Sequence, residues 1–149
     1  MTVAVLLMTF VQGLAAGICF DVAMVKLPTR RRIGAVAYAH FARGNDLGNG
    51  LKVYPYLVVG GGALLVALAI VAHLTAQPES LTYPLSVAAL AALGYLAATV
   101  KAAPIMWSLK TTPDDPRVLE EKLDRFAFWN AWRTVFQLCA FAALLGARL

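Results

Sequence analysis

The chain has 149 residues, of which 60% are hydrophobic and 14% are charged. Soluble domains carry about 25% charged residues, so the composition excludes an ordinary soluble domain and predicts an integral membrane protein with a single domain, residues 1–149. The formal net charge of +5 does not indicate a nucleic-acid-binding protein, because most basic residues lie in two loops beside hydrophobic segments, as topology signals do.

Four segments are apolar over roughly 20 residues, the length that a ~30 Å hydrocarbon core requires: residues 3–27, 53–74, 83–109 and 126–145. Helices satisfy their own backbone groups in lipid, so the expected fold is all-α, an integral membrane four-helix bundle. Pro28 and the basic run after it are expected to end the first span. Pro55 and Pro84 suit the first turns of the second and third spans.

The first loop contains a short helical pattern. Ile33, Val36, Ala37, His40 and Phe41 share one face at helical spacing, which predicts a short amphipathic helix on the membrane surface. The first and third loops are rich in Lys and Arg, whereas residues 75–82 contain neither. This bias places the first and third loops in the cytoplasm and both termini outside, in an inner or plasma membrane.

Three ionisable residues lie inside the apolar spans: Asp21, Lys101 and Arg133. Charges at such depth are costly and mark functional sites. At ~1.5 Å per helical residue, each lies about 9–12 Å from the cytoplasmic end of its span. We expect the three to converge in a polar pocket whose excess positive charge suits an anionic or enolisable ligand. The alternative is a packing salt bridge between Asp21 and Arg133, with Lys101 extending to the headgroups.

Asn130, Trp129 and Trp132 surround Arg133 in sequence. Asn130 can donate and accept hydrogen bonds, and the two Trp side chains either stack on an aromatic ligand or belong to an interfacial belt. Pro104 leaves the carbonyl near Val100 without its helical partner, as happens where a helix lines a cavity.

No cluster of His, Cys and carboxylate residues has metal-ligand spacing, and no phosphate-binding loop is present. The sequence therefore predicts no metal site, and it leaves any other cofactor undetermined.

Several short motifs in this order resemble the anthrone oxygenase-like family of small four-helix membrane proteins, most of unknown function. They are Gly13 and Gly17, Gly50 before Tyr54-Pro55, Ala103-Pro104-Ile105, and the segment from Arg125 to Arg133. In its characterised branch the resemblance implies an oxidoreductase that converts a polyketide anthrone to an anthraquinone with molecular oxygen.

By this resemblance, Asn130 and Arg133 correspond to polar positions at the start of the last helix. Arg133 and Lys101 are expected to stabilise the anion of a lipophilic aromatic substrate, and Asp21 is the candidate base. Asn130, Trp129, Trp132 and Tyr54 are the expected substrate-binding residues.

Two other functions stay open. The small aqueous mass and the glycine-rich helix faces also suit a non-enzymatic accessory or assembly subunit of a larger membrane complex. A carrier or channel ranks third, because no inverted repeat is present. The chain is expected to contact the bilayer, and either a homo-oligomer or a subunit of a complex is compatible with the sequence.

Overall fold

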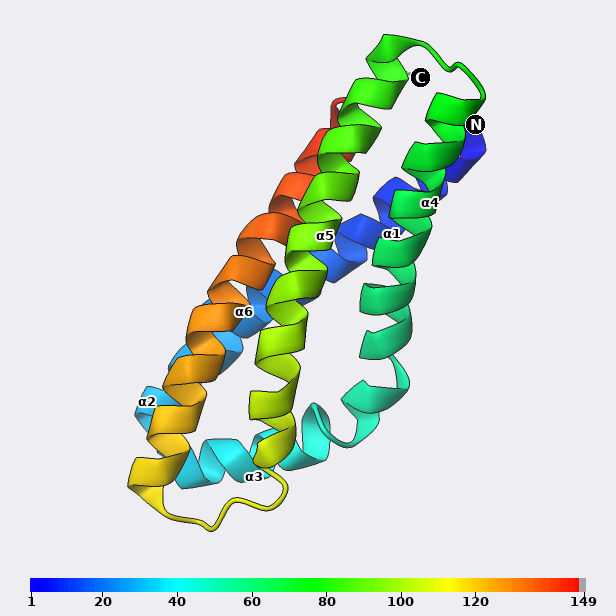
Figure 1. The fold of residues 1–149 in the computed structure, drawn as a ribbon. Coiled ribbons are helices and arrows are strands. Elements are labelled where there is room, and N and C mark those ends of the chain that lie inside the picture. The colour runs from blue at the N-terminus through cyan, green and yellow to red at the C-terminus, as the bar shows by residue number, and fades with distance from the viewer. Residues whose placement is uncertain (148–149) are drawn as a thin grey trace.

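A computed structural model describes residues 1–147, which are all-helical and contain no β-strand (Figure 1). The predicted all-α fold is therefore confirmed. The elements are α1 (Thr2–Asp21), the π-helix η1 (Val22–Lys26), α2 (Leu27–Ile33), α3 (Ala35–Asn45), the 3₁₀-helix η2 (Asn49–Lys52), the π-helix η3 (Tyr56–Gly60), α4 (Gly61–Leu74), α5 (Glu79–Ser108) and α6 (Pro116–Leu145).

Three helical rods are long and apolar enough to cross a membrane. Thr2–Ile33 forms one rod made of α1, η1 and α2, Tyr56–Leu74 forms the second from η3 and α4, and α5 is the third. These rods contain most of the first three predicted spans.

Pro28 does not end the first helix as predicted, because the helix continues to Ile33. Pro28 is tolerated because it lies in the first turn of α2, directly after a π turn in which the Leu27 N–H bonds to the Val22 carbonyl. The rod ends at Gly34, whose φ of 86° is easily reached only by glycine.

The predicted start of the third span is also too late. Pro78 has an extended backbone (ψ 152°) and precedes the first helical residue, Glu79. Pro84 and Pro104 therefore both lie inside α5, and each leaves one carbonyl a turn earlier without a helical N–H donor.

The helix α6 corresponds to the fourth predicted span, but its mean hydropathy is lowered by polar residues. Asn130, Thr134 and Gln137 recur at helical spacing and are all buried against the other helices. Large apolar side chains, among them Phe128 and Leu138, are exposed on its outer side. The outward surface of α6 is therefore more apolar than its sequence average suggests.

The long helices run side by side along the molecule (Figure 1). In this arrangement α5 packs against both α4 and α6, and α1 packs against α6 and α4. One apolar core lies among α1, α4, α5 and α6 and includes Leu65, Leu85 and Ala140. A second core, which includes Leu109 and Leu123, lies where α3 meets the ends of α5 and α6.

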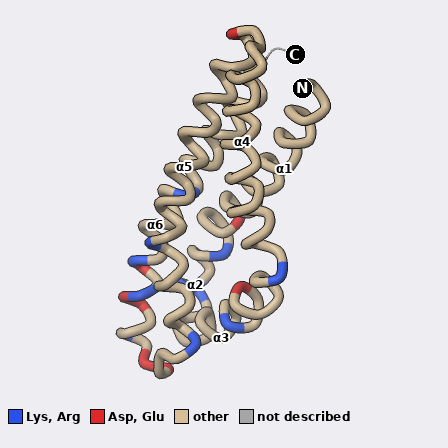
Figure 2. Tube along the Cα trace, turned by 45° about the vertical axis from the view of Figure 1, so that its right-hand side comes forward, with Lys and Arg blue, Asp and Glu red and all other residues tan. Residues whose placement is uncertain are grey.

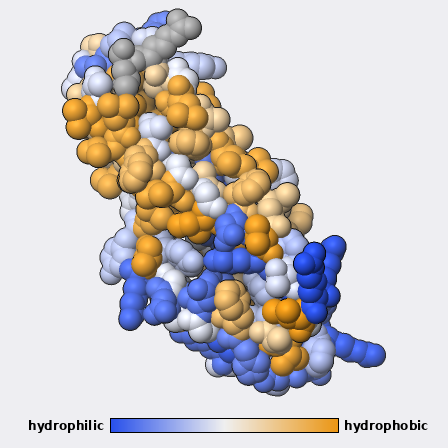
Figure 3. Space-filling view, turned by 180° about the vertical axis from the view of Figure 1, so that it is seen from behind, coloured by the Kyte–Doolittle hydropathy of each residue, from blue (hydrophilic) through white to orange (hydrophobic). Residues whose placement is uncertain are grey.

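Charged residues gather at the end of the molecule that holds α2 and α3, whereas the start of α1 and the end of α6 lie at the opposite end (Figures 1 and 2). Seen from behind, the body away from that charged end is covered largely by apolar residues (Figure 3). Thus the basic first and third loops share one end of the molecule.

The short helix predicted in the first loop exists as α3, but its buried face differs from the predicted one. Tyr38, Ala39 and Ala42 are buried, while Phe41 and His40 are exposed. The small alanine side chains permit close packing against the ends of α5 and α6. As a result α3 is part of the core rather than a separate surface helix.

Two glutamines join three helices in the interior. Gln137 of α6 donates from Nε2 to Oε1 of Gln12 on α1, and Gln12 donates from Nε2 to the Gly61 carbonyl of α4 at 3.1 Å. Both side chains are buried. Because a buried amide without partners is costly, this bridge fixes the depth at which the three helices meet.

We expect Gln137→Leu to lower the free energy of unfolding by about 1 kcal/mol, since it leaves the Gln12 amide oxygen without its donor in an apolar interior. The measurement is reversible unfolding in bicelles, with Cys139→Ala on the exposed side of α6 as the control.

The double variant Gln12→Leu with Gln137→Leu tests the coupling. We expect it to lose less than the sum of the two single variants. Strict additivity would show that the two amides do not stabilise each other.

Candidate functional site

A cavity of about 510 Å³ borders the core formed with α3 and a small buried cluster of Cys19, Val58 and Tyr95. Its walls come from α1, η1, the segment after α3, η3, α5 and α6, and they are mostly apolar. The lining residues are Ile18, Cys19, Val22, Asp46, Leu47, Leu51, Tyr54, Pro55, Val58, Val59, Tyr95, Thr99, Val100, Ala103, Pro104, Met106, Trp107, Phe126, Asn130 and Arg133.

The polar end of this cavity is built around Arg133. Its Nη2 donates to the Tyr95 hydroxyl at 2.8 Å, and its guanidinium carbon lies 5.2 Å from the centroid of the Tyr95 ring. Its Nη1 lies 3.5 Å from Asn130 Oδ1, and the Cys19 thiol lies 3.9 Å from the Tyr95 hydroxyl. These contacts hold the guanidinium in one orientation.

Two buried donors in this group have no partner among residues 1–147: Nε of Arg133 and Nδ2 of Asn130. An unsatisfied buried donor costs about 1–3 kcal/mol, and more when it is charged. Both residues line the cavity, and Asn130 is only 1% exposed. Both atoms lie just behind the accessible wall of the cavity, so a ligand oxygen reaches them only if neighbouring side chains move.

The positive charge of Arg133 is not neutralised by a neighbouring carboxylate. Within the described part of the chain, the ion pairs involve Lys26, Arg30, His40 and Arg43 as the basic partners, and none involves Arg133. The cavity therefore holds one cation without a direct ion pair, where the sequence predicted two, and the carboxyl group of Asp46 lines the same cavity.

The predicted convergence of three charges is wrong for Lys101 and Asp21. Lys101 is exposed and does not line the cavity, and Asp21 pairs with Lys26 at 3.3 Å instead of with Arg133. The reason is rotation about the helix axis, since successive residues turn by about 100°. Thr99 and Ala103 of α5 line the cavity, so Lys101, midway between them, points to the opposite side.

Of the other predicted ligand-binding residues, Asn130 and Tyr54 line the cavity, whereas Trp129 and Trp132 do not. Trp129 packs against the core beside α3, and Trp132 is half exposed, with its ring centroid 5.9 Å from that of Phe136. The tryptophan that lines the cavity is Trp107.

Asp46 lines the cavity, although the sequence did not single it out. Its Oδ1 accepts a hydrogen bond from Asn45 Nδ2 at 2.8 Å. Burial raises the pKa of Asp46 above its ordinary value, the charges of Lys26 and Arg133 oppose that rise, and Asp21 adds to it. Asp21 and Lys26 thus act on the site through the pKa of Asp46. In the sequence, the polar loop around Asp46 resembles a solvated turn. Only its closeness to the second span could have indicated that Asp46 lines the cavity.

Both π-helices border the cavity, which Val22 of η1 and Val58 and Val59 of η3 line. Such irregular turns are uncommon and occur frequently at functional sites. Nearby, a Cβ atom on Gly50 would lie 2.6 Å from the ring of Tyr54, so glycine at this position lets the ring pack against the backbone.

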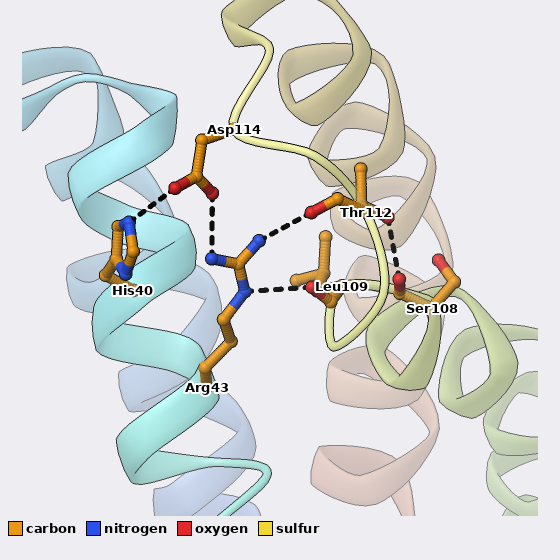
Figure 4. Close-up of polar contacts among 6 residues, drawn as sticks. All are labelled: His40, Arg43, Ser108, Leu109, Thr112 and Asp114. Atoms are coloured by element: carbon orange, nitrogen blue, oxygen red, sulfur yellow. Dashed lines mark hydrogen bonds and ion pairs between the residues drawn. The ribbon is translucent and has the colours of Figure 1, made fainter.

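A set of polar contacts, here called the α3 latch, holds this loop in place (Figure 4). Arg43 donates from Nε to the Leu109 carbonyl at 2.9 Å, from Nη2 to the Thr112 carbonyl at 2.8 Å and from Nη1 to Asp114 Oδ1 at 2.8 Å. His40 Nε2 lies 2.9 Å from Asp114 Oδ2. The latch fixes the end of α3, and hence the cavity-lining residues that follow it.

A second, open hollow of about 600 Å³ lies near the start of α5 and includes His73, Glu79 and Ser86. His73 Nε2 lies 2.8 Å from Ser86 Oγ, but that hydroxyl donates to the Thr82 carbonyl at 2.8 Å. The Ser86 proton is thus directed away from His73, and the hollow has no buried unpaired donor among the described residues. The cavity at Arg133 is the better candidate site.

In residues 1–147, no group of three or more His, Cys, Asp or Glu side chains is placed to hold a metal ion. Comparison of the chain with protein-family models, curated proteins and solved structures finds no match. The case for a function therefore depends on the site itself.

We expect Arg43→Ala to loosen the α3 latch and to speed amide hydrogen exchange in residues 46–52 and 109–115, because three hydrogen bonds to the facing loop are lost. The matched control is Lys110→Ala, an exposed basic residue of the same loop that forms no ion pair in the described chain. Equal exchange in both variants would contradict the latch.

The α3 latch is also expected to weaken as the pH falls. Hydrogen bonds from Arg43 hold the pKa of Asp114 below its ordinary value. The protection that this carboxylate gives is therefore complete above about pH 4, its ordinary pKa range, and is lost as the pH falls through the lowered pKa.

Proposed function

We propose that the chain spans the membrane four times, with α6 as the fourth span, as a four-helix bundle. The outward apolar face of α6 and its inward polar residues support this arrangement. The basic first and third loops share one end of the molecule, which favours a cytoplasmic position for that end and an outside position for both termini.

We further propose that the cavity at Arg133 is the active site of an oxygenase-like enzyme that acts on a lipophilic aromatic substrate of the anthrone type. The observation that carries this proposal is the pair of unpartnered buried donors, Arg133 Nε and Asn130 Nδ2, on two residues that line an apolar cavity. The volume lies in the usual range of about 300–1,000 Å³ for small-molecule sites. The resemblance of the sequence to the anthrone oxygenase-like family points to the same substrate class.

The chemistry begins with removal of a proton from a methylene group conjugated to a carbonyl. The electron pair delocalises onto the carbonyl oxygen, and the donors of Arg133 and Asn130 stabilise the resulting oxyanion. The Asp46 carboxylate, rather than Asp21, accepts the proton because Asp46 lines the cavity. Molecular oxygen is the oxidant: the methylene carbon becomes a carbonyl, and the second oxygen atom leaves as water.

Arg133→Ala and Asn130→Leu are each expected to lower kcat by about 10²–10³-fold, the cost of removing one oxyanion donor. The measurement is enzyme-dependent formation of quinone from an anthrone by purified protein in detergent under oxygen. Lys101→Ala is the matched control, because Lys101 has the same charge but lies outside the cavity.

Two results would count against the proposal. Absence of quinone formation by the natural protein across several anthrones, together with co-purification of a stoichiometric partner, would favour the accessory-subunit function. A loss in Lys101→Ala as large as that in Arg133→Ala would show that the reactive centre is not this cavity.

The fall in activity on the acidic side of the pH–rate profile reports protonation of the proposed base, Asp46. Because Asp46 must be deprotonated and its pKa is raised, we expect activity to fall at a pH above the ordinary carboxylate range of about 3.9. Asp46→Asn is expected to remove most of the activity. Asp21→Asn is expected to move this fall to lower pH, since it removes a negative charge that raises the pKa of Asp46. If Asp21→Asn does not shift the acidic side of the profile, the assignment of Asp46 as the base is contradicted.

A further inference from the structure

One wall of the cavity is open on the outside of the molecule. Most lining side chains are buried or half-buried, but Val59, Val100 and Trp107 are 49%, 70% and 55% exposed while also lining the cavity. Val59 belongs to η3, and the other two belong to α5. The opening therefore lies between η3 and α5, and its rim is apolar.

This opening lies at membrane depth in the proposed bundle. Both η3 and α5 belong to rods that are long and apolar enough to cross a membrane. Val100 is eight residues before Ser108, the last residue of α5, so it lies about 12 Å from the charged end of the helix. An apolar rim at this depth faces acyl chains rather than water.

The part of the cavity that lies nearest the charged end of the molecule is covered by protein. The segment that follows α3 lines the cavity there, and its Leu47 is buried in the core formed with α3. The α3 latch ties this segment to the loop between α5 and α6. Packed and hydrogen-bonded residues thus lie between this part of the cavity and the charged end of the molecule.

Both sides of the opening have an irregular backbone. η3 is a π-helix, and Pro104 of α5 gives the Val100 carbonyl no helical N–H donor. Helices with such interruptions bend more readily than regular ones. The two walls can therefore separate without breaking a regular hydrogen-bond ladder.

We propose that the cavity loads sideways from the bilayer, through the opening between η3 and α5. Its ligand is a membrane-dissolved molecule with an apolar body and one acceptor oxygen, which passes Val59, Val100 and Trp107 and meets Asn130 and Arg133 at the inner end. The inference rests on the proposed membrane placement and binding site, and it does not depend on the oxidation chemistry.

Cys19 provides a reporter inside the cavity, because it lines the wall and is 3% exposed. The other cysteine, Cys139, is exposed and is replaced in a Cys139→Ser background. The protein is reconstituted in phosphatidylcholine vesicles and treated with either an N-alkyl maleimide that dissolves in the bilayer or a charged methanethiosulfonate that stays in water. Labelling of Cys19 over time is read by mass spectrometry.

We expect the lipophilic reagent to label Cys19 severalfold faster than the charged reagent, and Val100→Trp to slow that labelling severalfold by filling the rim. Leu90→Trp is the matched control, since Leu90 lies on the same helix and is 69% exposed, compared with 70% for Val100, but does not line the cavity. Val59→Trp, with Leu64→Trp as its control, is the second pair if Val100→Trp does not fold.

Three results would overturn the inference: equal or faster labelling by the charged reagent, equal rates in Val100→Trp and Leu90→Trp, and labelling of Cys19 only after denaturation. Val58→Cys in a background without Cys19 and Cys139 repeats the test at a second lining position. Because labelling needs no turnover, lateral labelling without quinone formation would refute the proposed reaction alone. Quinone formation at the same rate in Val100→Trp and Leu90→Trp would refute the lateral route alone.

Discussion

The structure depends on the need to bury the polar side of α6. Asn130, Thr134 and Gln137 cannot face an apolar surrounding without partners, so each is turned inward. Gln137 donates to Gln12 of α1, and Thr134 donates to the Asn130 carbonyl of its own helix at 2.8 Å, with the Cys19 carbonyl of α1 at 3.2 Å. This requirement fixes the rotation of α6, and it also carries Arg133 to the wall of the cavity.

Along this polar stripe, some buried polar groups have hydrogen-bond partners and others do not. The amides of Gln12 and Gln137 use each other and a backbone carbonyl, which suits a purely structural bridge. One turn nearer the charged end, Arg133 has Tyr95 as a partner but keeps one donor unused, as does Asn130. The contrast separates amides that bridge the helices from the buried donors of Arg133 and Asn130 that have no partner among residues 1–147.

The sequence predicted the helical fold and the approximate positions of the three apolar rods, because a long apolar run is a local property. It also placed Asp21, Lys101 and Arg133 inside apolar helical segments. It did not predict which of these side chains lie close together, because that depends on the rotation of each helix about its axis. In the first rod, a π turn changes this rotation by an amount that composition does not reveal. Arg133 was found because it is an ionisable residue inside an apolar segment, and it lines the cavity because the polar side of α6 faces inward. Asp46 was missed because its burial comes from the tertiary packing of α3.

The π turn η1 has a consequence for how this fold tolerates changes in length. A π turn contains more residues than an α turn, so the segment before Val22 is rotated relative to a regular continuation of the segment after Lys26. Deleting a single residue within η1 would leave a plausible uninterrupted helix, yet it would turn Cys19 by about 100° relative to Arg30. The cavity wall and the ion pair between the buried Arg30 and the exposed Asp124 could then no longer form together. Descendants of this sequence are accordingly expected to exchange side chains along the first rod freely while keeping its residue count unchanged.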